Sequence, residues 1–336
     1  MGLFFVWLVK LLANRFGVID KPNIDRKIHK TPIPLMGGVG IFIASSIVLL
    51  GCRLLGWGNF SEVSDTFIWG VMIASIILMI GGILDDKYNL KPRYQMLFTL
   101  AAAVVVVLFG LKITFITNPF GDALNQLWYL APALSGVLVF FWLMAMMYTT
   151  KILDGLDGLV GGISAIASLF IFLLGINWDI PFSATGIWAL SILGGCLAFL
   201  VFNWYPAKIF LGEGGSIWLG FILGVLSIIS GSKIATTLLV VGIPMLDVVW
   251  VILQRLLSRQ SPFSHADKKH IHFQLLNLGL TQREAVLVLY TLAVAFGSLG
   301  VLTNSFGKII GIVILLLVMS LLVIFFNRQQ KNKISV

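Results

Sequence analysis

The sequence predicts an all-α fold, a polytopic integral membrane protein with about 11 (ten or eleven) transmembrane helices. Of its 336 residues, 59% are hydrophobic and only 11% are charged, and the mean hydropathy is +1.01. A soluble domain of this length would carry far more polar surface. Long apolar runs recur along the whole chain, and the Lys and Arg residues are distributed very unevenly between them.

The apolar runs predict the individual spans. A helix needs about 20 apolar residues to cross the hydrocarbon core of a bilayer. Ten stretches satisfy this requirement: 36–54, 66–84, 94–111, 127–147, 158–176, 183–202, 214–231, 234–255, 285–303 and 308–326. An eleventh stretch, GLFFVWLVKLLANRF, is short and contains Lys10. It lacks the basic lead-in of a signal peptide, so we interpret it as a shortened first helix. Residues 1–336 then form one transmembrane domain.

The basic residues predict the orientation. Loops that join odd-numbered to even-numbered helices, together with the C-terminal tail, contain eighteen Lys and Arg residues, whereas the opposite loops contain four. Cytoplasmic loops carry such an excess, so we expect the N-terminus outside and the C-terminus inside. The net charge of +9 is explained by this asymmetry, and we expect no nucleic acid partner.

The acidic residues and histidines gather on the same side. All four His residues and most Asp and Glu residues fall in the predicted cytoplasmic loops. Acidic residues contribute little to topology, so topology does not explain this accumulation. It indicates a polar site at the inner membrane surface, formed by the loops at about 14–36, 85–94, 148–158, 203–215 and 255–284.

Each of these loop features also has a purely structural interpretation. Paired acids at a helix end are often solvated, histidines in a basic loop are often surface residues, and glycines at span ends often serve packing or capping. Asp247 is harder to explain in this way, because a carboxylate inside a span faces a cavity or a partner. Several acids also come from separate loops with glycine turns, whose N–H groups can approach an anion.

Such a combination suits phosphate chemistry with a divalent cation. Carboxylates hold Mg²⁺ together with substrate phosphates and water, and we expect Mn²⁺ to be able to substitute for it. Lys and Arg residues and helix N-termini offset phosphate charge. The sequence has no GxxxxGK[ST] loop, so it does not support an ATP-driven pump of the P-loop type. Cys52 and Cys196 lie in apolar runs and form no thiol metal motif.

Five loop sequences, from DKPNIDRKIHKTPIPLMGG to HADKKHIHFQLLNLGLTQREAVLVLY, resemble in order those of the polyprenyl-phosphate N-acetylhexosamine-1-phosphate transferases, glycosyltransferase family 4. The first and last loops resemble the undecaprenyl-phosphate GlcNAc-1-phosphate branch. The resemblance implies that UDP-GlcNAc and a polyprenyl phosphate give polyprenyl-diphosphate-GlcNAc and UMP, with Mg²⁺ required. It also implies a bacterial plasma (inner) membrane protein with its active site facing the cytoplasm. A homodimer is compatible with the sequence.

The resemblance assigns roles to particular residues. The catalytic acids fall on Asp85, Asp86, Asp154 and Asp157. The expected metal ligands are Glu213, Asp86 and Asp154. The expected substrate-binding residues are Lys30, Lys151, Asn203, Lys268, Lys269, His270 and His272. Asp247 matches an acid in a PxxD element, here PMLD.

The chain also departs from the family pattern. NxxNxxDG reads YTTKILDG, with Tyr148 and Lys151 at the asparagine positions, the usual aspartate is Glu213 in LGEGGS, and Phe273 replaces a histidine. Lys151 could pair with Glu213 or Asp154, or contact a phosphate. These departures leave open another UDP-N-acetylsugar donor, including UDP-MurNAc-pentapeptide, or a non-catalytic envelope scaffold. A lipid or solute transporter is a further alternative, although its polar groups would run through the membrane midplane.

Overall fold

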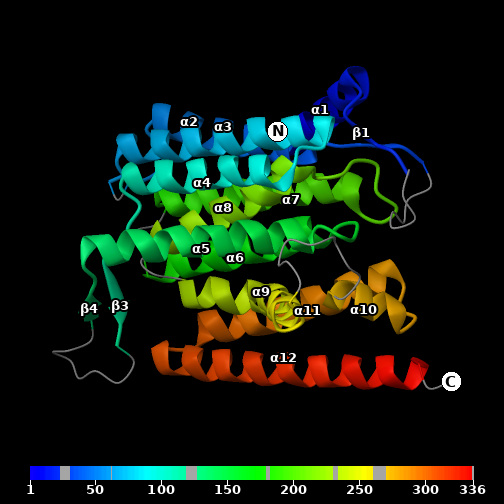
Figure 1. Ribbon diagram of the computed structural model, residues 1–336. Helices are drawn as coiled ribbons and strands as arrows, with labels where there is room; N and C mark the ends of the chain where they lie inside the picture. The colour runs from blue at the N-terminus through cyan, green and yellow to red at the C-terminus, as the bar shows by residue number, and fades with distance from the viewer. Residues whose placement is uncertain are drawn as a thin grey trace.

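The structure, a computed structural model, describes residues 1–22, 31–61, 63–118, 127–178, 182–229, 234–259 and 270–334. Within these ranges the chain forms a layered bundle of helices, most of which run side by side (Figure 1). The helices are α1 (Gly2–Phe16), α2 (Gly37–Leu54), α3 (Asp65–Tyr88), α4 (Pro92–Leu108), α5 (Pro132–Leu153), α6 (Leu159–Trp178), α7 (Ala184–Asn203), α8 (Glu213–Ile229), α9 (Ile234–Leu257), α10 (Ile271–Asn277), α11 (Gln282–Leu302) and α12 (Ser305–Ile334).

The predicted spans are confirmed. Among the described residues, α2, α3, α5, α6, α7, α9, α11 and α12 are long and apolar enough to cross a membrane. Two shorter apolar helices, α4 and α8, coincide with two further predicted spans. The protein is therefore a multi-pass membrane protein. The first helix, α1, has 15 residues, which corresponds to a length of about 22 Å and is less than the thickness of a bilayer core.

Two small antiparallel sheets were not predicted. β1 (Ile19–Asp20) pairs with β2 (Ile33–Pro34), and β3 (Phe115–Thr117) pairs with β4 (Leu127–Tyr129). β4 occupies residues that we had placed at the start of the span 127–147. The helix begins instead at Pro132, because proline has a fixed φ that suits the first turn of a helix and no N–H to leave unpaired.

α8 lies at the centre of the bundle. Every residue from Gly214 to Ile228 is buried, as expected for a helix that is apolar all round. Its first turn approaches two neighbours very closely. A Cβ atom added to Gly82 of α3 would lie 2.0 Å from Gly214 Cα, and one added to Gly38 of α2 would lie 2.1 Å from Gly215 Cα. These small residues fix the N-terminus of α8 between α2 and α3.

One end of the bundle gathers the polar loops. α3, α5 and α7 end there, and α4 and α8 begin there, on the right in Figure 1, opposite the β3–β4 hairpin. We call this end the site end. The five loops predicted to form the site therefore meet at one end of the bundle, as far as the structure describes them.

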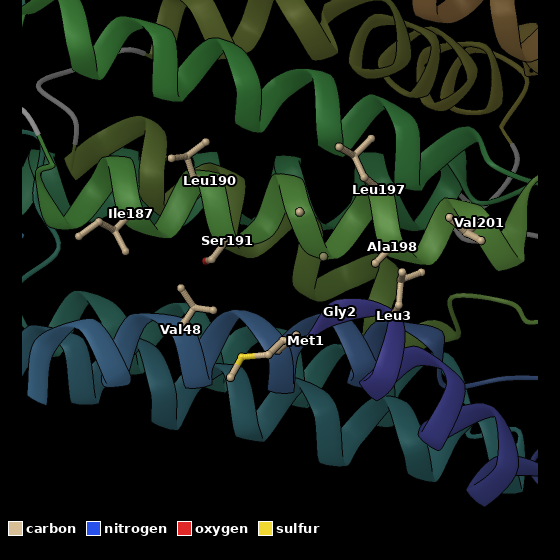
Figure 2. Close-up of a pocket in the computed structure, with 13 residues that line it drawn as sticks. Met1, Gly2, Leu3, Val48, Ile187, Leu190, Ser191, Leu197, Ala198 and Val201 are labelled. Atoms are coloured by element: carbon tan, nitrogen blue, oxygen red, sulfur yellow. The ribbon is translucent and has the colours of Figure 1, made fainter. Parts of the chain in front are cut away.

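A cavity of about 710 Å³ lies elsewhere, between α1, α2 and α7 (Figure 2). Its lining is apolar apart from Ser191 and includes Val48, Leu190 and Leu197. The short α1 begins alongside the middle of α7, where a Cβ atom added to Gly2 would lie 2.8 Å from Ala198 Cβ. The lining of this cavity includes no acidic, basic or histidine side chain, so the cavity is not a candidate for the predicted phosphate chemistry.

Candidate active site

The paired aspartates at the end of α3 have different partners. The Asp85 side chain is buried, and its Oδ1 accepts a hydrogen bond from the Leu90 backbone N–H at 2.8 Å. This contact closes the turn after the helix. The Oδ1 of Asp86 accepts a hydrogen bond from the Glu213 backbone N–H at 2.9 Å. The pair thus connects α3 both to its own loop and to the first residue of α8.

The first turn of α8 is built around the Asp86 carboxylate. Gly212 has φ 79°, in the left-handed region that favours glycine. A Cβ atom at this position would lie 2.5 Å from Asp86 Oδ2, so a larger residue would displace the carboxylate. The partial positive charge of a helix N-terminus favours an anion there. Asp86 and Glu213 are therefore held side by side.

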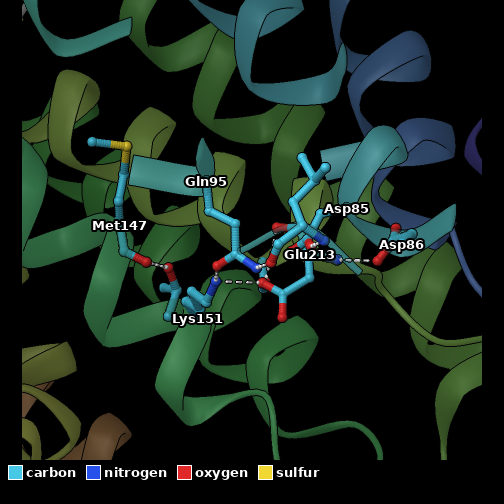
Figure 3. Close-up of polar contacts among 9 residues, drawn as sticks. Asp85, Asp86, Gln95, Met147, Lys151 and Glu213 are labelled. Atoms are coloured by element: carbon cyan, nitrogen blue, oxygen red, sulfur yellow. Dashed lines mark hydrogen bonds and ion pairs between the residues drawn. The ribbon is translucent and has the colours of Figure 1, made fainter. Parts of the chain in front are cut away.

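Lys151 lies in the last turn of α5 and contacts two side chains. Its Nζ lies 2.9 Å from Glu213 Oε2 and donates a hydrogen bond to Gln95 Oε1 at 2.6 Å (Figure 3). The Glu213 Oε2 atom is itself buried and accepts no hydrogen bond of good geometry among the described residues. Lys151 is thus the cation that offsets the charge of Glu213, and of the two acids that the sequence offered as partners it pairs with Glu213. Its contact with a phosphate remains a prediction.

Gln95 is a site residue that sequence reasoning missed. It lies in the first turns of α4, and its Nε2 donates a hydrogen bond to the Leu90 backbone carbonyl at 3.1 Å. The contacts form a chain that runs from Asp85 through Leu90 and Gln95 to Lys151 (Figure 3). A polar amide near one end of a short apolar span was the available signal.

Asp154 follows the last residue of α5. The side chain is exposed to solvent, although many protein atoms surround it. Burial raises the pKa of Asp154 to about 8, and the charges of Glu213, Asp86 and Asp157 add to this rise. Three other acids therefore lie close enough to repel this carboxylate, and their combined negative charge favours a bound cation.

Asp157 and Asn203 hold two loops together. The Oδ2 of Asp157 accepts a hydrogen bond from the Ala207 backbone N–H at 2.9 Å. The Asn203 side chain is buried, its Oδ1 accepts from the Gly158 N–H at 2.8 Å, and its Nδ2 donates to the Ile209 carbonyl at 2.8 Å. These bonds join the loop after α5 to the loop before α8. The predicted roles of both residues toward substrate remain predictions.

The histidines are held by Asp247 of α9. The two carboxylate oxygens of Asp247 contact His270 Nδ1 at 2.9 Å and the Ile271 backbone N–H at 3.1 Å. The His272 ring stacks parallel to that of His270, with 5.8 Å between the ring centroids. A Cβ atom on Gly155 would lie 2.5 Å from His272 Nε2, so the histidines cover the loop that contains Asp154. Burial, reinforced by His270, lowers the pKa of His272 to about 3, so the ring is neutral.

The structure thus brings Asp86, Glu213 and Lys151 into direct contact and places Asp154 within their electrostatic reach. The remaining predicted residues that the structure describes lie at helix ends or in the loops that adjoin this group, namely Asp85, Asp157, Asn203, His270 and His272. The predicted substrate-binding residues Lys30, Lys268 and Lys269 lie outside the described residues.

No group of three or more His, Cys, Asp or Glu side chains is already arranged to hold a metal ion in the part of the chain that the structure describes. The chemistry of Asp86, Asp154 and Glu213 nevertheless fits Mg²⁺, which binds carboxylate oxygens together with water and phosphates. Mutual repulsion at Asp154 and the buried Glu213 Oε2 both favour a cation here. The donor atoms are of the right kind, although they are not gathered into one ligand set among the described residues.

Fold and site together define a multi-pass membrane protein with an acidic, lysine-containing site at one end of its helices. The chain belongs to glycosyl transferase family 4, whose model matches residues 68–231. This confirms the family suggested by the loop sequences.

Three curated relatives are similar over most of their length. The "Probable undecaprenyl-phosphate N-acetylglucosaminyl 1-phosphate transferase" of Bacillus subtilis (strain 168) is 32% identical over 304 residues, which cover 89% of this chain and 80% of the relative. The "Decaprenyl-phosphate N-acetylglucosaminephosphotransferase" of Mycolicibacterium smegmatis is 30% identical, over 86% of this chain and 77% of the relative. The "Undecaprenyl-phosphate alpha-N-acetylglucosaminyl 1-phosphate transferase" of Escherichia coli (strain K12) is 27% identical, over 89% and 80%.

Proposed function

We propose that this protein transfers N-acetylglucosamine-1-phosphate from UDP-GlcNAc to undecaprenyl phosphate or a related polyprenyl phosphate, giving polyprenyl-diphosphate-GlcNAc and UMP. The observation that carries the proposal is the contact group of Asp86, Glu213 and Lys151, with Asp154 beside it. It lies at one end of a membrane bundle, in a chain similar over most of its length to proteins named for this reaction.

The location of the site suits the two substrates. A polyprenyl phosphate stays in the bilayer with its phosphate at the surface, whereas a UDP-sugar is water-soluble, so the two meet only at the membrane surface. The excess of Lys and Arg on the loops of the site end supports a cytoplasmic orientation. We therefore place the reaction at the inner face of a bacterial plasma membrane.

The reaction is a phosphoryl transfer. An oxygen of the lipid phosphate attacks the phosphorus attached to the sugar, and the bond from this phosphorus to the bridging oxygen breaks, releasing UMP. A phosphate monoester has a second pKa near 6, so the nucleophile needs little deprotonation at neutral pH. Positioning and charge compensation therefore supply most of the catalysis. We assign to Asp85 the uptake of the residual proton or the orientation of the lipid phosphate.

The acids and cations of the site divide the remaining tasks. Glu213, Asp86 and Asp154 would hold Mg²⁺, with Mn²⁺ as a substitute. When bound, the ion neutralises phosphate charge and stabilises the departing UMP. Lys151 offers a positive charge next to these acids, and we assign to Asp157 a contact near the uridine. The remaining predicted substrate contacts are Asn203 on the nucleotide side, His270 and His272 with Lys268 and Lys269 at the sugar-phosphate, and Lys30 at the nucleotide.

A purified preparation tests the proposal. We expect UMP release that requires UDP-GlcNAc, undecaprenyl phosphate and Mg²⁺ together. Absence of UMP release under these conditions, from protein that is folded, would overturn the assignment. A panel of donors that includes UDP-MurNAc-pentapeptide tests the sugar, and we expect UDP-GlcNAc to be preferred.

The same assay separates two chemical routes. We favour direct displacement, in which donor without lipid acceptor gives no UMP. Stoichiometric UMP release without lipid, with label retained on the protein, would instead indicate an aspartyl-phosphate intermediate.

A further inference from the structure

The Glu213 carboxylate is already paired with a cation of the protein itself, the Lys151 ammonium. Lys151 Nζ lies 2.9 Å from Glu213 Oε2, an oxygen that is buried and accepts no well-formed hydrogen bond among the described residues. The Lys151 side chain is only 20% exposed, and that of Glu213 is 39% exposed. Two positive charges close to one carboxylate repel each other strongly in such a partly buried place. An ammonium and a divalent ion are therefore unfavourable together on Glu213.

Lys151 is also tethered by a second residue. Gln95 Oε1 accepts a hydrogen bond from Lys151 Nζ at 2.6 Å, and Gln95 Nε2 is fixed by the Leu90 carbonyl at 3.1 Å. The tether comes from α4 and does not involve Glu213. If the ammonium leaves Glu213, Gln95 still keeps it beside the acids.

The net charge of the acidic group depends on the Lys151 ammonium. When ionised, Asp86, Asp154 and Glu213 leave an excess of negative charge that a single ammonium does not offset. A divalent ion would offset the remaining charge, but on Glu213 it would meet the ammonium at the same carboxylate. A diphosphate that enters the site brings new negative charge and gives the displaced ammonium a partner.

We propose that Lys151 competes with the divalent metal for Glu213 and, once displaced, binds the phosphate groups of the donor while Gln95 keeps it in place. Gln95 is then a positioning residue for Lys151. The inference rests on the proposed function for the identity of the donor, but the competition at Glu213 does not depend on any substrate.

Competition predicts that removing the Lys151 ammonium makes the metal bind more tightly, whereas structural damage to the site would weaken metal binding. We would titrate the purified, full-length protein with Mn²⁺ alone and follow the free ion by electron paramagnetic resonance. For Lys151→Met, which removes the charge and keeps most of the side-chain length, we expect Mn²⁺ to bind about tenfold more tightly, the size expected for one partly buried ion pair. In UMP-release assays the same variant should show a donor KM that is raised about tenfold or more.

Lys87→Met is the matched control. Lys87 is exposed at the same end of α3, and its described contact is with the Tyr88 ring, 5.6 Å from the ring centroid. It removes one positive charge from the site end without touching the acids, so both the Mn²⁺ affinity and the donor KM should stay at the wild-type values. Unchanged or weaker Mn²⁺ binding by Lys151→Met would overturn the proposal.

Two further variants complete the test. Gln95→Leu should leave Mn²⁺ affinity near the wild-type value and raise the donor KM, because only the tether is lost. Lys151→Arg keeps the charge and should bind Mn²⁺ as the wild type does, which keeps the proposal testable if Lys151→Met fails to fold.

Tighter Mn²⁺ binding by Lys151→Met in a protein that releases no UMP would refute the proposed function alone. Normal UMP release with unaltered Mn²⁺ affinity would refute the competition alone.

Discussion

Two groups of motif residues at the same end of the bundle are held in opposite ways. Asn203 uses both atoms of its amide on backbone groups, and Asp157 accepts a backbone hydrogen bond. Glu213 has a buried oxygen without a well-formed hydrogen bond, and among the described residues no protein group donates a hydrogen bond to the Asp154 carboxylate. Backbone groups of the protein satisfy the first pair, whereas in the second pair Glu213 has only the Lys151 ammonium beside it.

A residue of a family motif is therefore not automatically a catalytic residue. Buried polar groups are normally hydrogen-bonded, and those that are not require a further explanation. Asn203 and Asp157 are explained by the two loops that they join. Glu213 is explained by its pair with the Lys151 ammonium, and Asp154 is exposed to solvent, so neither carboxylate is used to join loops. This contrast can be tested by substitution.

The largest effect is expected for Glu213→Gln. The amide can still accept a hydrogen bond from Lys151 but cannot compensate a metal charge, so we expect turnover to fall by about a hundredfold or more. Protein level in the membrane and thermal stability should stay close to those of the wild type. Near-normal UMP release would remove Glu213 from the site.

Asp85→Asn tests whether the buried partner of Leu90 acts in chemistry. The Asn oxygen can accept the Leu90 hydrogen bond, so the turn after α3 should persist. We expect turnover to fall by about a hundredfold or more, because a proton acceptor or an orienting charge is lost. If only stability changed and the rate per folded molecule did not, Asp85 would belong with Asn203 as a structural residue.

Asn203→Ala should act mainly on stability. It leaves the Gly158 N–H and the Ile209 carbonyl without their partner, and we expect a loss of about 1–3 kcal/mol in the free energy of unfolding. Thermal unfolding in detergent, compared with Glu213→Gln, measures this difference. A raised donor KM with unchanged stability would instead assign Asn203 to nucleotide binding.

The smallest effect concerns pH, because Asp154 is exposed and solvent screens its charge. The pKa of Asp154 is raised to about 8 in the folded protein, so between about pH 4 and 8 the folded state retains a proton that the unfolded chain has released. Without divalent ions, stability should therefore fall as pH rises through this range, and Mg²⁺ should reduce the fall. Asp154→Asn should remove this contribution. Thermal unfolding at several pH values, with and without Mg²⁺, provides the measurement, and a slope unaffected by Asp154→Asn would contradict it.

The sequence predicted much of the fold and part of the site. The ten long or intermediate apolar helices were found within a few residues of their positions, except that α5 begins at Pro132 and β4 replaces the expected start of its span. Gln95 was missed because nothing in its local sequence connects it to Lys151, which lies 56 positions later. The structural use of Asn203 was missed for the same reason.

The sequence alone determined the class of protein, the spans, the family and the acids worth testing, because hydropathy, charge distribution and motif spacing are properties of local stretches. Tertiary structure decided which groups meet. It separates Asp85 from Asp86 and gives Lys151 to Glu213, and it joins Asp86 to a backbone N–H 127 positions away. The physical reason is that these contacts depend on the close approach of glycines between α2, α3 and α8, which fixes side chains from distant segments within hydrogen-bond distance.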